Sequence, residues 1–184
     1  MHRNKQQAPT ISKHTSIRIA TYNCQGINEI TKREAIKAWA SERRLDVVVL
    51  TETKLKGQSK EGNEHTDYIT YFASDPKDWT NTQQGIKAEQ AGVGIMIRSS
   101  LAASVLDIAQ HGSRFMTMKI KTSPPMRIIA AYLPQAFGAS WEQKSAYYDT
   151  LDELLDACPR KEPVYIMGTL MQGYNTDRQT SSPT

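Results

Sequence analysis

Apolar residues recur along this chain in short runs, and the runs end at small or polar residues. In the clearest of them, residues 46–52, four consecutive apolar residues precede Thr51 and the carboxylate of Glu52. Three of the four are β-branched, which predicts a strand buried on both faces. Taken alone, Glu52 is equally well a solvated residue at a strand end or a metal ligand held at the edge of a rigid sheet.

Further predicted strands end in the same way. Residues 17–23 end at Asn23, residues 128–132 at Tyr132 and residues 164–168 at Gly168. Several apolar strands that end in small or polar residues indicate a functional site at the edge of the sheet where these strands end. This recurrence favours the functional interpretation of Glu52. Four more strands are predicted at residues 68–72, 92–98, 105–109 and 115–120.

Two amphipathic helices are predicted, one near each end of this series of strands. Thr31 and Glu34 have the spacing of a capping box at the start of the first helix, as do Ser140 and Gln143 at the start of the second. Residues 54–66 and 75–90 are polar and predict loops. The order of helices and strands predicts an α/β (α+β) fold with two mostly antiparallel sheets flanked by helices.

Composition limits the partners and the cellular location that can be expected for this protein. The net charge of +4 comes mostly from the polar residues 1–15, which predict a disordered basic tail and do not demand a polyanionic partner. Cys24 and Cys158 form neither a disulfide framework nor a zinc spacing, which favours an intracellular location, nuclear or cytoplasmic. With no signal peptide and no long apolar run, neither secretion nor a membrane span is expected.

Five short motifs, each near the end of a predicted strand, resemble successive motifs of the endonuclease/exonuclease/phosphatase superfamily. More narrowly, they resemble the apurinic-type endonuclease domain of non-LTR retrotransposons. The resemblance runs from about Ser16 to Gly168, so the predicted domain is residues 16–168. The motifs lie at residues 21–27, 50–53, 92–95, 131–134 and 166–168.

The resemblance implies a four-layered α/β sandwich and Mg²⁺-dependent hydrolysis of phosphodiester bonds in DNA. It implies that Glu52 is the principal Mg²⁺ ligand and that Asn23 holds the metal shell or a phosphate oxygen through its amide. Tyr132 would donate to the scissile phosphate. A nucleic-acid contact is also expected from the lysines that follow Glu52, which are Lys54, Lys56 and Lys60.

The chain departs from this resemblance after Gly168. The family continues with Asp-Phe-Asn-Ala, where this chain has Thr169, Leu170, Met171 and Gln172. The base and its supporting amide are therefore lost at Thr169 and Met171, and the later Ser-Asp-His motif has no counterpart. We expect an incomplete sandwich, truncated at its C-terminal side. The four histidines, His2, His14, His65 and His111, are expected at the surface.

The form of the departure suggests a lost base near the Gly168 codon. Met171 is encoded by ATG and Gln172 by CAA or CAG, so moving the frame back by one base gives GCA, an alanine codon. The codon before it can then be AAT, for asparagine, and the full Asp-Phe-Asn-Ala becomes readable. Residues 169–184 are thus predicted to be a polar, off-frame tail.

The sequence leaves three functional hypotheses open. The first is a fragment of a Mg²⁺-dependent endonuclease domain that is catalytically inactive. The second is a non-catalytic module that binds nucleic acid through the three lysines and the basic tail. The third is a small-molecule phosphatase of the same superfamily, because loops set the substrate and their specificity is not readable from one sequence.

Overall fold

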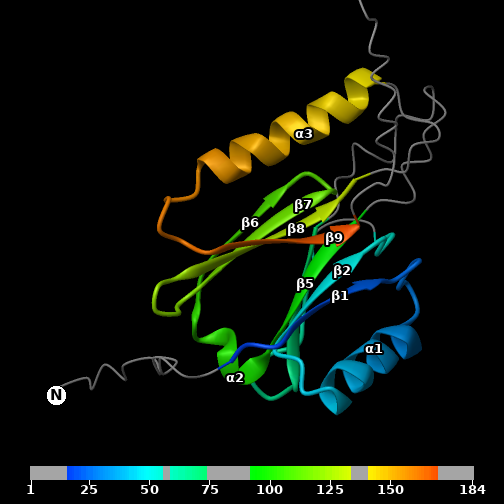
Figure 1. Ribbon diagram of the computed structural model, residues 1–184. Coiled ribbons are helices and arrows are strands. Elements are labelled where there is room, and N and C mark those ends of the chain that lie inside the picture. The colour runs from blue at the N-terminus through cyan, green and yellow to red at the C-terminus, as the bar shows by residue number, and fades with distance from the viewer. Residues whose placement is uncertain (1–15, 56–58, 74–91, 134–140, 170–184) are drawn as a thin grey trace, which may run out of the picture.

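The computed structural model describes residues 16–55, 59–73, 92–133 and 141–169, and Figure 1 shows their arrangement. Several predictions fall outside these residues. They concern the tail at residues 1–15, the loop at residues 75–90, the capping residue Ser140, the tail beyond Thr169, and Lys56, Met171, His2 and His14.

Nine strands form two sheets in the described part of the chain. The first sheet has the order β1 (Ile19–Asn23), β2 (Val47–Thr51), β5 (Val93–Arg98), β4 (Tyr68–Ala73) and β3 (Ser59–Glu61). The second has the order β6 (Val105–His111), β7 (Phe115–Ile120), β8 (Met126–Tyr132) and β9 (Val164–Thr169). Only the pairs β1–β2 and β8–β9 are parallel, so the prediction of mostly antiparallel sheets is confirmed.

Three helices accompany the sheets in the residues that the structure describes: α1 (Ile30–Glu42), the short α2 (Ser99–Ala102) and α3 (Trp141–Asp156). Helix α1 covers the outer face of the first sheet, and α3 covers the outer face of the second (Figure 1). One apolar cluster fills the space between the sheets, and one lies under each of the two longer helices. These three cores separate four layers, which confirms the predicted α/β sandwich.

Strand β2 lies inside the first sheet, between β1 and β5, and all five of its residues are buried. Val47 and Val49 belong to the core between the sheets, whereas Val48 and Leu50 pack under α1. Burial on both faces explains why this strand reads as a continuous apolar run. The rigid end of β2 is what carries Glu52.

The first predicted capping box is wrong. Helix α1 begins at Ile30 with Glu29 as the N-cap, and no side chain caps it. The Arg33 guanidinium binds the carbonyls of Ile27 and Asn28 ahead of the helix, and Glu34 pairs with Lys37 instead of reaching back. Contacts with the preceding loop, rather than a local hydroxyl, therefore define the start of the helix.

Two short elements, α2 and β3, were not predicted from the sequence. Strand β3 lies within the predicted loop at residues 54–66, and its register with β4 pairs Lys60 with Tyr71. His111, expected at the surface, lies at the end of β6 with its ring partly buried, because that strand extends two residues past Ala109. None of the described helices is long and apolar enough to cross a membrane.

Candidate functional site

The ends of four strands meet at one edge of the sandwich. In the parallel pairs, Asn23 lies opposite Thr51 and Tyr132 lies opposite Thr169. The two sheets are joined there by a hydrogen bond of 3.0 Å between the hydroxyls of Thr51 and Thr169. The structure therefore brings Asn23, Glu52 and Tyr132 together, and it adds Thr169 from the neighbouring strand.

The amide of Asn23 orients the carboxylate of Glu52. Its Nδ2 donates to Glu52 Oε1 at 2.8 Å, and its Oδ1 accepts from the backbone N–H of Gln25 at 3.1 Å. Because a backbone N–H can only donate, Oδ1 must face Gln25, and the donor end of the amide must face Glu52. In this position Asn23 acts on Glu52 as a hydrogen-bond donor.

The backbone at Glu52 has an uncommon conformation. Glu52 has a φ of 53° and Lys54 a φ of 55°, both in the left-handed region. For residues with a side chain this conformation costs about 1–3 kcal/mol each, and it persists only where the surroundings impose it. Here the N–H groups of Gly26 and Ile27 donate to the carbonyls of Glu52 and Thr53 at 2.7 and 3.0 Å. The loop after β1 thus fixes the end of β2.

The phenol of Tyr132 stays protonated at neutral pH. Burial raises the pKa of Tyr132 to about 12, and the charge of Glu52 and a hydrogen bond with it act in the same direction. The nearby guanidinium of Arg114 acts in the opposite direction. A protonated phenol beside a carboxylate can donate a hydrogen bond to that carboxylate or to an anionic ligand.

Arg114 is a residue of this region that sequence reasoning missed. Its guanidinium lies 5.5 Å from the ring centre of Tyr132 and 4.9 Å from that of Tyr147, and the residue is only 9% exposed. Within the described ranges, no carboxylate forms an ion pair with it. The backbone explains its position, since Tyr132 N–H donates to the Arg114 carbonyl at 2.9 Å.

The two described lysines of the predicted set, Lys54 and Lys60, are not brought together. A Cβ added to Gly26 would lie 3.4 Å from Lys54 Cδ, so Lys54 extends along the turn that follows Asn23. Lys60 instead lies on β3, three strands from β2, with its ammonium 5.4 Å from the ring centre of Tyr71. Of the described lysines in this set, Lys54 is therefore the one close to Glu52.

The residues around Glu52 fit a weakly held divalent cation. Among the described residues, no three His, Cys, Asp or Glu side chains gather as a metal cluster, and none of the ion pairs found there involves Glu52. Mg²⁺ is commonly held by one or two carboxylates, with water and substrate phosphates as the other ligands. One carboxylate without a protein counter-charge meets the minimum of that requirement.

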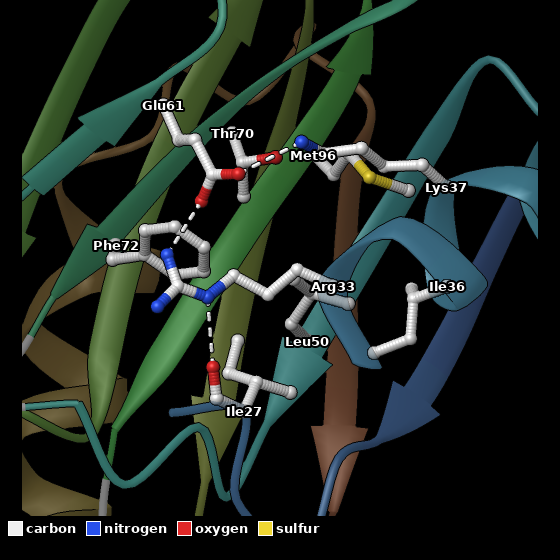
Figure 2. Close-up of a pocket in the computed structure, with 9 residues that line it drawn as sticks. All are labelled: Ile27, Arg33, Ile36, Lys37, Leu50, Glu61, Thr70, Phe72 and Met96. Atoms are coloured by element: carbon white, nitrogen blue, oxygen red, sulfur yellow. Dashed lines mark hydrogen bonds and ion pairs between the residues drawn. The ribbon is translucent and has the colours of Figure 1, made fainter. Parts of the chain in front are cut away.

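A small pocket between α1 and the first sheet has a different character (Figure 2). Glu61 receives Arg33 Nη1 at 3.0 Å and Lys37 Nζ at 2.8 Å, and all three side chains line the pocket. Burial alone would raise the pKa of Glu61, but these two hydrogen-bonded cations hold the pKa below its usual value. The free volume of about 10 Å³ is near the minimum for a single water molecule. These charges are already paired, and they connect α1 to β3.

Comparison with known families and structures places this geometry in context. The model of the Endonuclease/Exonuclease/phosphatase family matches residues 20–168, about four fifths of the chain. The chain belongs to the endonuclease/exonuclease/phosphatase family. The resemblance drawn from the motifs is thereby confirmed, and the matched region ends at Gly168, where the motif pattern also ends.

Solved structures share the fold of this family member. An AP endonuclease from Archaeoglobus fulgidus has a TM-score of 0.55 at 17% identity, over 83% of this chain and 56% of that one. The catalytic domain of Xenopus laevis APE2 has a TM-score of 0.55 at 16% identity, over 82% and 57%. The endonuclease domain of TRAS1, a telomere-specific non-LTR retrotransposon, has a TM-score of 0.50 at 11% identity, over 83% and 58%.

These identities are low, so the likeness is one of fold. The family member described here spans less than three fifths of the length of each of these three structures. A comparison with curated protein sequences finds no match. The roles of Asn23, Glu52, Tyr132 and Lys54 therefore rest on the motifs and on the geometry described above.

Proposed function

We propose that this chain is an endonuclease-type domain that binds the phosphate backbone of DNA at the Glu52 edge and holds Mg²⁺ there weakly, without detectable cleavage. One observation carries the proposal. The Glu52 carboxylate is held by neutral donors from Asn23 and Tyr132, and the residue that reaches this edge from β9 is Thr169. The family and its AP-endonuclease-like fold support the nuclease class.

The proposed binding uses groups with distinct roles. Glu52 would hold Mg²⁺, which when bound neutralises charge on a phosphodiester and polarises its oxygens. Asn23 would keep the carboxylate oriented through its Nδ2 donor. Tyr132 would donate its phenolic proton to a phosphate oxygen, and the guanidinium of Arg114 would add positive potential beside it. Lys54 would contact the phosphate backbone next to the turn after β1.

The absence of cleavage follows from the chemistry of Thr169. A water nucleophile needs a base close to it, and the resemblance implies an aspartate where this chain has Thr169. A threonine hydroxyl is far too weak a base at pH 7. Losing one positioned proton-transfer group typically costs about 10²–10⁴-fold in rate. The Glu52 carboxylate does not replace it, because its proposed role is to hold the metal ion.

The test combines a cleavage assay with a binding assay. Supercoiled plasmid and an oligonucleotide with one abasic site are incubated with the chain and Mg²⁺, and binding to the same oligonucleotide is followed by fluorescence anisotropy over a salt series. We expect no nicking, together with binding that weakens steeply as salt rises and that weakens further in Lys54→Ala. Mg²⁺-dependent nicking that disappears in Glu52→Ala would overturn the inactive assignment. No binding at low salt would overturn the DNA-binding one.

A further inference from the structure

The backbone of Gly92 lies close to the segment that carries Glu52. It lies directly before β5 with a φ of 112°, a conformation that residues with a side chain rarely adopt. A Cβ added to Gly92 would lie 2.2 Å from Thr53 Oγ1 and 3.2 Å from the backbone nitrogen of Lys54. Since real side chains do not approach that closely, any other residue at position 92 must displace the Thr53 hydroxyl and press on the backbone of Lys54.

Thr53 is held between two segments that are distant in sequence. Its N–H donates to the carbonyl of Gly92 at 3.0 Å, and its carbonyl accepts from Ile27 N–H at 3.0 Å. The side chain is fully buried, and its Oγ1 has no hydrogen-bond partner in the described part of the chain. Packing against Gly92, rather than a polar contact of its own, therefore keeps this side chain in place.

The residues on either side of Thr53 both have left-handed backbones, so the chain turns sharply there. The backbone conformation of Glu52 sets the direction of its side chain. A change in that turn would therefore change the 2.8 Å hydrogen bond from Asn23 Nδ2 to Glu52 Oε1. A shift of Thr53 by the distance that a Cβ at Gly92 requires would be passed on to Glu52 through one peptide unit. Gly92 thus contacts the residue next to Glu52 and does not contact the carboxylate itself.

We propose that Gly92 is a positioning residue for Glu52: its missing side chain lets Thr53 seat against the start of β5, which aims the carboxylate at Asn23. The inference deepens the proposed Mg²⁺ site, on which it rests. It assigns a functional reason to a glycine that strand propensity alone does not explain. Gly94, two residues further along in β5, serves as a matched control. Its added Cβ would lie 2.9 Å from Phe72 Cδ1, in the core under α1 and not at the Glu52 edge.

The experiment compares Gly92→Ala with Gly94→Ala in the full chain. Mg²⁺ affinity is measured by calorimetry and stability by thermal melting. The side-chain amide resonance of Asn23, assigned with Asn23→Asp, reports the hydrogen bond to Glu52 without any metal. We expect Gly92→Ala to lower Mg²⁺ affinity about tenfold or more, the usual effect of disturbing a residue that orients a metal ligand. The Asn23 resonance should move as well. Gly94→Ala should lower the melting temperature but leave both the affinity and the resonance unchanged.

The double variant Gly92→Ala with Thr53→Ala removes the 2.2 Å contact and covers the case in which Gly92→Ala does not fold. It should recover part of the affinity and part of the Asn23 shift, because the strain at φ 112° and the 3.2 Å contact with the backbone nitrogen of Lys54 remain. Equal effects of Gly92→Ala and Gly94→Ala on Mg²⁺ binding and on the resonance would overturn the positioning role. If the unaltered chain binds no Mg²⁺, the proposed metal site fails, and the Asn23 resonance alone then decides the role of Gly92.

Discussion

The two ends of β2 each carry a carboxylate, and the structure uses them differently. At the start of the strand, Asp46 accepts the backbone N–H of Arg18 at 2.8 Å and lies 3.6 Å from Arg98 Nε. Arg98 also binds the carbonyl of Leu45 and the hydroxyl of Tyr68, at 3.0 and 2.9 Å. The charge of Asp46 is therefore balanced inside the protein. At the other end, the donors to Glu52 that the described residues supply are neutral and come from Asn23 and Tyr132.

This difference separates a structural carboxylate from one that can still bind a cation. A carboxylate next to a guanidinium has little remaining attraction for a second cation, whereas a carboxylate held by neutral donors keeps its negative potential. The backbone supports the same distinction. The turn at Glu52 is strained, and strain of this kind gathers at binding and catalytic sites. The comparison predicts that changes at the Asp46 end reduce stability, and that changes at the Glu52 end reduce ligand binding.

The largest effect on stability is expected at the Asp46 end. Arg98→Ala removes two hydrogen bonds and an ion pair, although the side chain is 28% exposed and solvent weakens the pair. We expect the free energy of unfolding to fall by about 2 kcal/mol. Asn23→Ala, which removes two side-chain hydrogen bonds at the exposed end, should cost only about 1 kcal/mol, because solvent can replace both. Urea denaturation measures both, and equal losses would remove the distinction between the two ends.

A smaller effect is expected when the Glu52 end is given a second negative charge. Thr169→Asp places a carboxylate beside Thr51, one residue from Glu52 along β2, in place of the hydrogen bond between two hydroxyls. Without metal, repulsion between the two carboxylates should lower stability by about 1 kcal/mol. Mg²⁺ should restore it, so melting curves with and without Mg²⁺ should differ more for this variant than for the unaltered chain. A metal-independent melting temperature would contradict the placement of the site.

The third effect concerns pH and has no influence on stability at neutral pH. The pKa of Tyr132 is raised to about 12 in the folded chain, above the usual value of 10. The folded state therefore retains this proton between pH 10 and 12, where the unfolded chain loses it, and stability falls as pH rises through that window. Tyr132→Phe should lose less stability between pH 10 and 12 than the unaltered chain, as followed by urea denaturation. The same slope in both proteins would mean that Glu52 and burial do not act on this phenol.

Much of the fold could be predicted from the sequence because its strands are strongly patterned. Strand β2 and the helices α1 and α3 follow from apolar runs and stripes that depend on local spacing alone. Strand β3 could not be found this way, because its Glu61 is held by Arg33 and Lys37 from α1 and not by apolar burial. The start of α1 was missed for a similar reason, since Arg33 fixes it through carbonyls ahead of the helix.

The candidate site likewise contains residues that local sequence patterns indicate and residues that only tertiary contacts place there. Asn23, Glu52 and Tyr132 each end a patterned strand, so their meeting at one edge could be expected before the structure was known. Arg114 has no such signal, because only the pairing of β7 with β8 places it beside Tyr132. The contact of Gly92 with Thr53 joins residues far apart in sequence, and no local pattern shows it. The apolar pattern of the strands thus indicates the candidate site residues, whereas the residues that position them are found only from the tertiary structure.

The most direct test of the account measures Mg²⁺ affinity at both ends of β2. Calorimetric titration with Mg²⁺ is carried out on the unaltered chain, on Glu52→Gln and on Asp46→Asn, with a melting curve for each protein. We predict that Glu52→Gln abolishes Mg²⁺ binding with little change in melting temperature. Asp46→Asn should leave the affinity unchanged and lower the melting temperature. Undiminished Mg²⁺ binding by Glu52→Gln would contradict the central claim that the uncompensated carboxylate at this edge holds the metal.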